Sequence, residues 1–269
     1  MNLILAMAQS LYSVRFYRQV LPASLAKGFL YLALWAAVFS MLVSMVVVVR
    51  FLPEANRFLE WFRQEMPVLE WTPEGMTINR PSPYVMKHPR YGHVATFDLS
   101  KEEAGNAEIG DALFFLTSSK LYVRQNARNE VRVYDLKPAD AAAKAKAKNF
   151  VLDAAKVRQF ERSFKPLMIL ILAVGTFFIF FIWKMIAALF YSLIALLINL
   201  FRQSRLPYES LLNVSFFAMT ASIWITILQL FAGGIFTMPL GFLGSALLTT
   251  IYLYLAIKLT EDSSPPMTA

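Results

Sequence analysis

The residue types that usually carry out acid–base or metal chemistry are scarce in this chain. It has two histidines and no cysteine, and both histidines, His88 and His93, lie in the short segment HPRYGH. No cysteine or carboxylate pair accompanies them at a metal-ligand spacing. Pro89 and Gly92 between them are typical of a turn. We therefore expect two loop histidines and no metal site.

Nucleophile and nucleotide-binding motifs are also missing from the sequence. It has no GxSxG, HExxH, GxGxxG or P-loop pattern, so hydrolase, metalloprotease and nucleotide-dependent reactions have no basis here. The carboxylates Asp98, Asp111 and Asp135 stand at the ends of predicted strands, where solvated turn residues are common. These patterns predict a protein that is not an enzyme and that holds no cofactor.

Polar side chains inside apolar segments are better functional candidates, because removing a charge from water is costly. Lys184 is the one charge between residues 166 and 201, and Asn199 and Gln229 lie near the ends of apolar segments. Two interpretations of Lys184 stay open: it extends to the lipid headgroups as an anchor, or it has a buried partner in a transport pathway. For Asn199 and Gln229 we expect ordinary bonding between helices or at the interface.

Small residues recur at every fourth position in the last two apolar segments. The two rows are Ala218, Ser222 and Thr226 in one segment and Gly241, Ser245 and Thr249 in the other. Such rows allow helix backbones to approach closely. They predict packing of these two helices on each other, with docking onto a foreign transmembrane partner as the alternative.

A third group of candidates lies near the N-terminus. The segment from residue 11 to 21 spaces its apolar residues on one helical face, with Arg15 and Arg18 beside them. Together with Lys27, these cations suit anionic lipid headgroups, within an interfacial segment at 1–27. An ordinary basic flank to a membrane span is the alternative. No cleavable signal peptide is expected, because the first residues carry no basic leader.

The elements that must position these residues follow from composition. With 57% hydrophobic residues and a mean hydropathy of +0.50, the chain of 269 residues has more apolar surface than one soluble core needs. Most of its charged residues fall between positions 51 and 165, which predicts lipid around the ends of the chain and water around its middle. The net charge of +8 comes from interspersed basic and acidic residues, a pattern that argues against nucleic acid as a partner.

The uncharged stretches predict an α-helical membrane protein with about four transmembrane helices and an inserted extramembrane α+β domain on a helical stalk. A turn at Lys184 would lack Gly, Pro and a polar loop, so we expect one long helix there rather than two spans. The predicted helices cover residues 28–49, 166–201, 210–231 and 238–257, and a polar tail follows at 258–269.

Residues 50–165 form the predicted extramembrane domain. Amphipathic helices at 51–66 and 139–165, the second capped by Asp140, are expected to pair as the stalk. Between them, residues 68–137 change to a period of two and are punctuated by Pro, Gly and Asn, which indicates a small antiparallel β unit.

Three strands of this β unit are specific enough to name. Phe114–Leu116 and Leu121–Val123 are expected to form a hairpin, and Val131–Tyr134 a further strand.

Four spans would place both termini on one side of the membrane. The loops on that side carry an excess of Arg and Lys, which the positive-inside rule makes cytoplasmic. Residues 50–165 would then be extracytoplasmic. Basic residues in the stalk oppose this orientation, but long loops cross a membrane largely regardless of charge.

Four segments give the chain a resemblance to a known family. SLYSVRFYRQV precedes the first span, TFDLS and ALFFLTSSKLYVRQN fall in the β unit, and YESLLNVSFFAMTASIW opens the third span. Together they resemble a bacterial membrane protein family of unknown function. Some of its members are called maltodextrin-utilisation proteins, and it looks related to Yip1-like membrane proteins. The resemblance implies a span, a β-containing domain and a C-terminal helical bundle, and it brings no catalytic residues.

We therefore expect a non-enzymatic accessory, scaffold or sensor protein of the bacterial inner (cytoplasmic) membrane. Its extracytoplasmic domain would bind a partner, and its bundle would anchor it or dock onto a membrane complex. The expected partners are the lipid bilayer and another membrane or envelope protein, with a homo-oligomer as a further option. The alternative function is a transporter or channel component with Lys184 in its membrane region.

Overall fold

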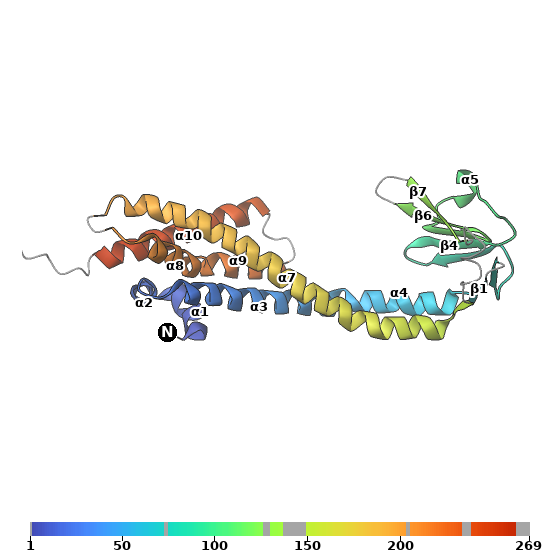
Figure 1. Ribbon diagram of the computed structural model, residues 1–269, viewed down its shortest axis with the longest axis horizontal. Helices are drawn as coiled ribbons and strands as arrows, with labels where there is room; N and C mark the ends of the chain where they lie inside the picture. The colour runs from blue at the N-terminus through green and yellow to red at the C-terminus, as the bar shows by residue number, and fades with distance from the viewer. Residues whose placement is uncertain are drawn as a thin grey trace, which may run out of the picture. The chain divides into compact units, whose positions relative to one another are not determined.

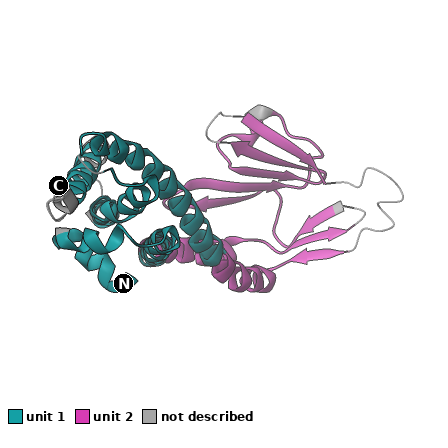
Figure 2. Ribbon diagram, turned by 60° about the vertical axis from the view of Figure 1, so that its left-hand side comes forward, with its two compact units in different colours: residues 1–49, 168–269 teal, residues 50–167 magenta. Residues whose placement is uncertain are grey.

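The chain divides into two compact units (Figure 2). The helical unit comprises residues 1–49 and 168–269, and the sheet unit comprises residues 50–167. This division separates the apolar ends of the sequence from its charged middle. A computed structural model describes the chain in six stretches, residues 2–72, 75–125, 130–136, 149–202, 205–232 and 238–261.

Three helices are long and apolar enough to cross a membrane, counted over the described residues. They are α3 (Leu25–Arg50), α7 (Ala154–Asn199) and the segment Tyr208–Phe231. Their length suffices because an α-helix rises about 1.5 Å per residue and the hydrocarbon core is about 30 Å thick. The fourth predicted span, residues 238–257, falls in α10 (Met238–Glu261), in which the stretch Leu243–Lys258 is apolar.

The start of α7 corrects the helix predicted for 139–165. Phe150–Leu152 is strand β8, so no helix runs through it. Residues 137–148, with the predicted cap Asp140, lie outside the described part of the chain. Asp153 caps the helix instead, because its carboxylate accepts the backbone N–H of Lys156 at 2.8 Å.

Once started, α7 continues through Pro166 to Asn199. Proline removes one backbone hydrogen bond from a helix interior, and the sequence therefore predicted a boundary at this residue. The expectation of one helix through Lys184, rather than two spans with a turn there, is confirmed.

The span predicted for 210–231 is divided into α8 (Tyr208–Ala218) and α9 (Thr220–Ala232), with Met219 between them. The Thr220 hydroxyl donates to the Phe217 carbonyl at 2.7 Å and satisfies a backbone acceptor next to the interruption. No Gly or Pro marks this position, so the sequence predicted an unbroken helix.

The N-terminal segment folds against the helical bundle. Its elements are α1 (Leu3–Tyr12), the 3-10 turn η1 (Val14–Phe16) and α2 (Tyr17–Val20). They contact α8, α9 and α10, which lie side by side (Figure 1). Phe16, Tyr17 and Val20 are buried in the helical core. The segment predicted to be interfacial therefore has a second face that packs on protein.

α8 forms the centre of this core, and every residue from Leu211 to Ala218 is buried. Two of them are polar, Asn213 and Ser215. The Asn213 amide donates to the carbonyls of Val20 at 3.0 Å and Ala23 at 2.8 Å. Gly28 of α3 makes the close approach of α3 and α8 possible, because a Cβ at this position would overlap Asn213 and Phe216.

The sheet unit contains two sheets. The smaller is antiparallel, in the order β2 (Gly75–Ile78), β1 (Leu69–Thr72) and β8. The larger has the order β3 (Tyr84–His88), β4 (Gly92–Asp98), β5 (Phe114–Thr117), β6 (Lys120–Gln125) and β7 (Glu130–Asp135).

One strand pair departs from the antiparallel unit that the sequence predicted, because β4 and β5 are parallel. A parallel pair needs a crossover connection rather than a tight turn, and residues 99–113, with the short helix α5 (Asn106–Ile109), provide it. The predicted hairpin is confirmed as β5–β6, with Leu116 opposite Leu121, and the further strand as β7.

Both faces of the larger sheet carry buried side chains. Met86, Phe97 and Leu116 form one core with residues of the smaller sheet and with Trp61 and Phe62 of α4 (Leu52–Glu65). Phe115 and Tyr122 form the other core with Ile109 of α5. The alternation of side chains along β5 and β6 thus serves two cores.

Candidate functional site

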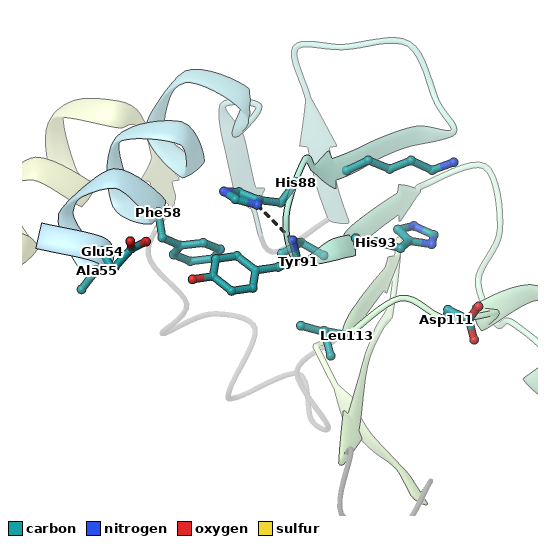
Figure 3. A pocket seen from close by; sticks show the side chains of 11 residues that line it. Glu54, Ala55, Phe58, His88, Tyr91, His93, Asp111 and Leu113 are labelled. Carbon is teal, nitrogen blue, oxygen red and sulfur yellow. Dashed lines mark hydrogen bonds between the residues drawn. The ribbon is translucent and has the colours of Figure 1, made fainter. Parts of the chain in front are cut away.

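The main pocket of the sheet unit lies between α4 and the turn that joins β3 to β4. Its volume is about 1020 Å³. Glu54, Ala55 and Phe58 contribute from α4. Lys87, His88, Tyr91, Gly92, His93 and Val94 line it from β3, β4 and their turn, and Asp111 and Leu113 from the segment before β5. The two histidines predicted as loop residues therefore lie on strand ends in one pocket (Figure 3).

Aromatic rings form one wall of this pocket. The ring of Phe58 lies 5.6 Å from that of His88 and 5.7 Å from that of Tyr91, measured between centroids. His88 also lies 4.5 Å from Trp61 and 4.7 Å from Tyr91. Figure 3 shows the rings of Phe58 and Tyr91 beside each other next to His88. Tyr91 is 52% exposed, so part of this apolar wall remains open to an incoming group.

The orientation of the His88 ring is set by the backbone of the turn. Its Nδ1 accepts the N–H groups of Arg90 at 3.0 Å and Tyr91 at 3.1 Å. The proton of the neutral ring is then on Nε2. His88 thus works as a turn cap with an aromatic face, rather than as a free base.

His93 lies on the other side of the pocket. Its Nε2 is 2.7 Å from the Thr96 hydroxyl. Burial lowers the pKa of His93, and the nearby Lys87 ammonium lowers it further, so the ring is neutral at pH 7. No group of three or more His, Cys, Asp or Glu side chains within the described stretches could hold a metal ion.

The two carboxylates that line the pocket, Glu54 and Asp111, form ion pairs with nearby arginines. The Glu54 carboxylate lies 3.1 Å from the Arg90 guanidinium and 3.4 Å from that of Arg57. Asp111 lies 3.8 Å from Arg124. Exposed pairs of this kind contribute little stability. The pocket therefore offers an aromatic wall and a charged rim, which suits binding of a group with an apolar body.

The other carboxylates predicted at strand ends differ in their surroundings. Asp98, at the end of β4, is buried and accepts hydrogen bonds from Ser100 and Ser82. The Ser100 hydroxyl is the main reason why the pKa of Asp98 is lowered. Asp135, at the end of β7, is exposed. Asp98 thus connects the end of β4 by hydrogen bonds to Ser82, before β3, and to Ser100, after β4.

In the helical unit, Lys184 turns inward. It is 8% exposed, and its ammonium lies 3.4 Å from the Ser222 hydroxyl of α9 and 5.5 Å from the centre of the Phe180 ring. No carboxylate of the described residues forms an ion pair with it. Of the two interpretations left open, this geometry favours a buried position over an anchor at the headgroups.

A lysine beside a serine is also the base–nucleophile pair of some hydrolases. The Ser222 hydroxyl, however, donates to the Met219 carbonyl at 2.8 Å and is 3% exposed. The Lys184–Ser222 pair is therefore arranged as an internal contact between α7 and α9.

The remaining predicted membrane residues lie apart from one another. The Asn199 side chain donates to the Leu206 carbonyl at 3.0 Å and accepts the Leu206 N–H at 3.1 Å. It thereby links the end of α7 to the residues just before α8. Gln229 is half-buried in α9. The cations Arg15, Arg18 and Lys27 are exposed.

The two rows of small residues lie on helices that contact each other, because α10 packs against both α8 and α9. Ala218, Ser222 and Thr249 are buried, and Thr226 and Ser245 are half-buried. The surroundings of Gly241 lie outside what the structure describes. Contacts among these helices therefore cover most of the small residues in the two rows.

One polar cluster was missed by sequence reasoning. The Tyr31 hydroxyl lies 2.5 Å from that of Thr220 and 3.0 Å from that of Ser10, and Tyr17 donates to the Ser10 carbonyl at 3.1 Å. The cluster joins α1, α2, α3 and the start of α9 next to the interruption at Met219. The signal was the presence of hydroxyl residues in otherwise apolar stretches, but their partners are far apart in sequence.

Comparisons with known proteins bear on the origin of this architecture. No curated protein and no solved structure matches the chain. The sequence model of DUF1189, described as a protein of unknown function, matches residues 5–257. The resemblance to a family of unknown function is therefore confirmed, and the chain belongs to the DUF1189 family.

Proposed function

We propose that the protein is a non-enzymatic accessory or sensor protein of the bacterial inner membrane, and that its sheet unit binds an envelope partner in the aromatic pocket. α10 acts as the fourth span, both termini are cytoplasmic, and residues 50–165 are extracytoplasmic. α4 and the first turns of α7 act as the stalk, for which the ion pair between Arg63 and Glu161, at 3.7 Å, gives support.

The observation that carries this proposal is the open aromatic wall of Phe58, His88 and Tyr91. Aromatic side chains in a partly open pocket are the usual anchors of protein interfaces. The paired charges around it, Glu54 with Arg90 and Asp111 with Arg124, resemble the polar rim of such an interface. The partner feature that fits is an aromatic or aliphatic side chain presented by a protein segment.

Photo-crosslinking in native membranes tests this proposal. A photoreactive amino acid at the exposed position Lys87 is expected to give one discrete adduct with another protein. A second change, Tyr91→Ala, should abolish the adduct, whereas Tyr134→Ala, on the exposed strand β7, should leave it intact. An adduct that survives Tyr91→Ala, or the absence of any adduct, would refute the proposal.

Orientation is tested separately with introduced cysteines, because the natural chain has none. Arg132→Cys in β7 and Lys27→Cys in the first turn of α3 are both at exposed positions. A membrane-impermeant maleimide applied to intact spheroplasts should label the first and spare the second. The opposite pattern would reverse the proposed topology.

The second candidate function is a component of an anion transporter, and the buried ammonium of Lys184 favours it. A cation within a membrane bundle is a recognised mark of an ion pathway. Release of chloride or inorganic phosphate from reconstituted vesicles should then exceed release from empty vesicles and fall in Lys184→Met. Equal release from vesicles with and without the protein would exclude this function for these anions.

A further inference from the structure

A second pocket lies within the helical unit, where the C-terminal turns of α7 and α10 come together. Its volume is about 420 Å³. Most of its wall is apolar and includes Leu197, Phe201 and Tyr254, which are 60%, 92% and 48% exposed. A contiguous set of apolar side chains this exposed marks a surface that contacts lipid, a ligand or another protein.

Two cations stand at one end of this pocket. Arg202 follows the end of α7, and Lys258 closes the apolar stretch of α10. The Lys258 ammonium lies 5.8 Å from the centre of the Tyr254 ring, so the charge remains next to the apolar wall. None of the described residues that line the pocket is acidic. The pocket thus combines an apolar wall with two cations at one end.

The level of these cations along the helices identifies the ligand chemistry. Both lie where an apolar helix ends, which is the level of the lipid headgroups for a helix that spans a bilayer. A phosphate group complements the two cations, and an acyl chain complements the apolar wall. Free phosphate would use the first feature and leave the second unexplained.

We propose that this pocket binds one anionic phospholipid, with its phosphate between Arg202 and Lys258 and an acyl chain along Leu197, Phe201 and Tyr254. The proposal shares the membrane placement of the proposed function but not its aromatic pocket, which belongs to the sheet unit. Loss of the lipid site would leave the aromatic pocket unaffected, and loss of partner binding at the aromatic pocket would leave the lipid site unaffected.

Native mass spectrometry of the full chain in mild detergent tests the lipid site. The probes are phosphatidylglycerol and phosphatidylcholine with the same acyl chains. The wild-type protein should retain one molecule of phosphatidylglycerol and release phosphatidylcholine. A cation near an anionic lipid contributes about fivefold to binding, so the double variant Arg202→Gln, Lys258→Gln should bind phosphatidylglycerol roughly 30-fold more weakly.

A matched variant separates this pocket from the general positive charge of the unit. Arg15→Gln, Lys27→Gln removes two exposed cations that do not line the pocket, and it should retain the lipid as the wild type does. Leu197→Trp keeps every charge but fills the pocket with a larger side chain, so this variant should also lose the lipid. Because Lys258 and Leu197 are exposed, Lys258→Gln and Leu197→Trp provide tests that do not depend on the buried Arg202.

Three results would overturn the proposal. The first is equal retention of the two lipids. The second is equal loss in the pocket variant and in the matched variant. The third is full displacement of the lipid by inorganic phosphate, which would show that the site takes phosphate alone.

Discussion

The two units bury polar groups by different means. In the sheet unit, Asp98 keeps its charge, because it accepts hydrogen bonds from Ser100 at 2.5 Å and Ser82 at 3.3 Å and lies 4.0 Å from the Lys101 ammonium. In the helical unit, the buried cluster of Ser10, Tyr31 and Thr220 is neutral. A charge that leaves water needs a countercharge or several hydrogen bonds, and the helical unit has few charged residues to provide them.

The two units are therefore held together by different forces. The stability of the sheet unit should depend on the ionisation of carboxylates. That of the helical unit should depend on close packing and on hydrogen bonds between neutral groups. Substitutions in either unit test this difference.

The largest effect is expected at Gly28, where α3 meets α8. Gly28→Ala should lower the free energy of unfolding by about 3 kcal/mol, because the added Cβ overlaps Asn213 and Phe216 in a filled core. Denaturant unfolding in detergent measures this loss. Gly175→Ala in α7 is the control, since a Cβ there meets nothing within 4 Å. Equal stability of the two variants would contradict close packing at α3 and α8.

The next effect is expected at Asp98 and should depend on pH. Asp98→Asn should destabilise the sheet unit at pH 7 by about 2 kcal/mol, the usual contribution of hydrogen bonds to a charged group. The pKa of Asp98 is lower in the folded protein than its ordinary value of 3.8. Its contribution is therefore complete above pH 3.8 and is lost as the pH falls through the folded pKa.

Hydrogen exchange of β4 amides in the full-length protein, corrected for intrinsic rates, measures the effect of Asp98. Wild-type protection should fall toward that of Asp98→Asn as the medium is acidified below pH 3.8. Asp111→Asn is the control, because its side chain is 99% exposed. If the protection of the α8 amides fell as much as that of the β4 amides on acidification, the two units would not differ in their dependence on carboxylates.

A smaller effect is expected in the neutral cluster. Tyr31→Phe should lower the free energy of unfolding by about 1 kcal/mol, since it removes a hydroxyl between Ser10 and Thr220. The hydroxyls of Ser10 and Thr220 are themselves 3.0 Å apart and can still form a hydrogen bond with each other, which limits the loss of stability. Tyr12→Phe, at a side chain that is 75% exposed, should have no effect. A loss of several kcal/mol would mean that the Ser10 and Thr220 hydroxyls are left without a partner in the variant.

Local patterns in the sequence predicted those elements whose partners are close in sequence. Apolar stretches marked α3 and the long course of α7, and alternation marked the β5–β6 hairpin, because a short turn brings these strands together. The parallel pairing of β4 with β5 and the strand at Phe150–Leu152 escaped prediction, since each depends on a strand far along the chain. Pro166 also suggested a boundary that the helix does not have.

The candidate sites show the same limit. The segment HPRYGH suggested a turn with two histidines, but its aromatic wall exists only because α4 brings Phe58 and Trp61 against it. Lys184 stood out from sequence as a charge in an apolar segment. Its burial depended on which face of α7 meets α9, which no local pattern of α7 determines.

Lys184 is the exception within the helical unit, and its replacement should have the smallest effect on stability. Lys184→Met keeps most of the side-chain volume and removes a charge whose described polar contact is the Ser222 hydroxyl. Replacement of a buried ion by an apolar residue is often neutral or stabilising, so we expect a change within about 1 kcal/mol, in the stabilising direction. Denaturant unfolding measures it, with the exposed Lys258→Met as the control. A loss of several kcal/mol would show that a countercharge meets Lys184 in the folded protein, and the helical unit would then hold its buried charge as the sheet unit does.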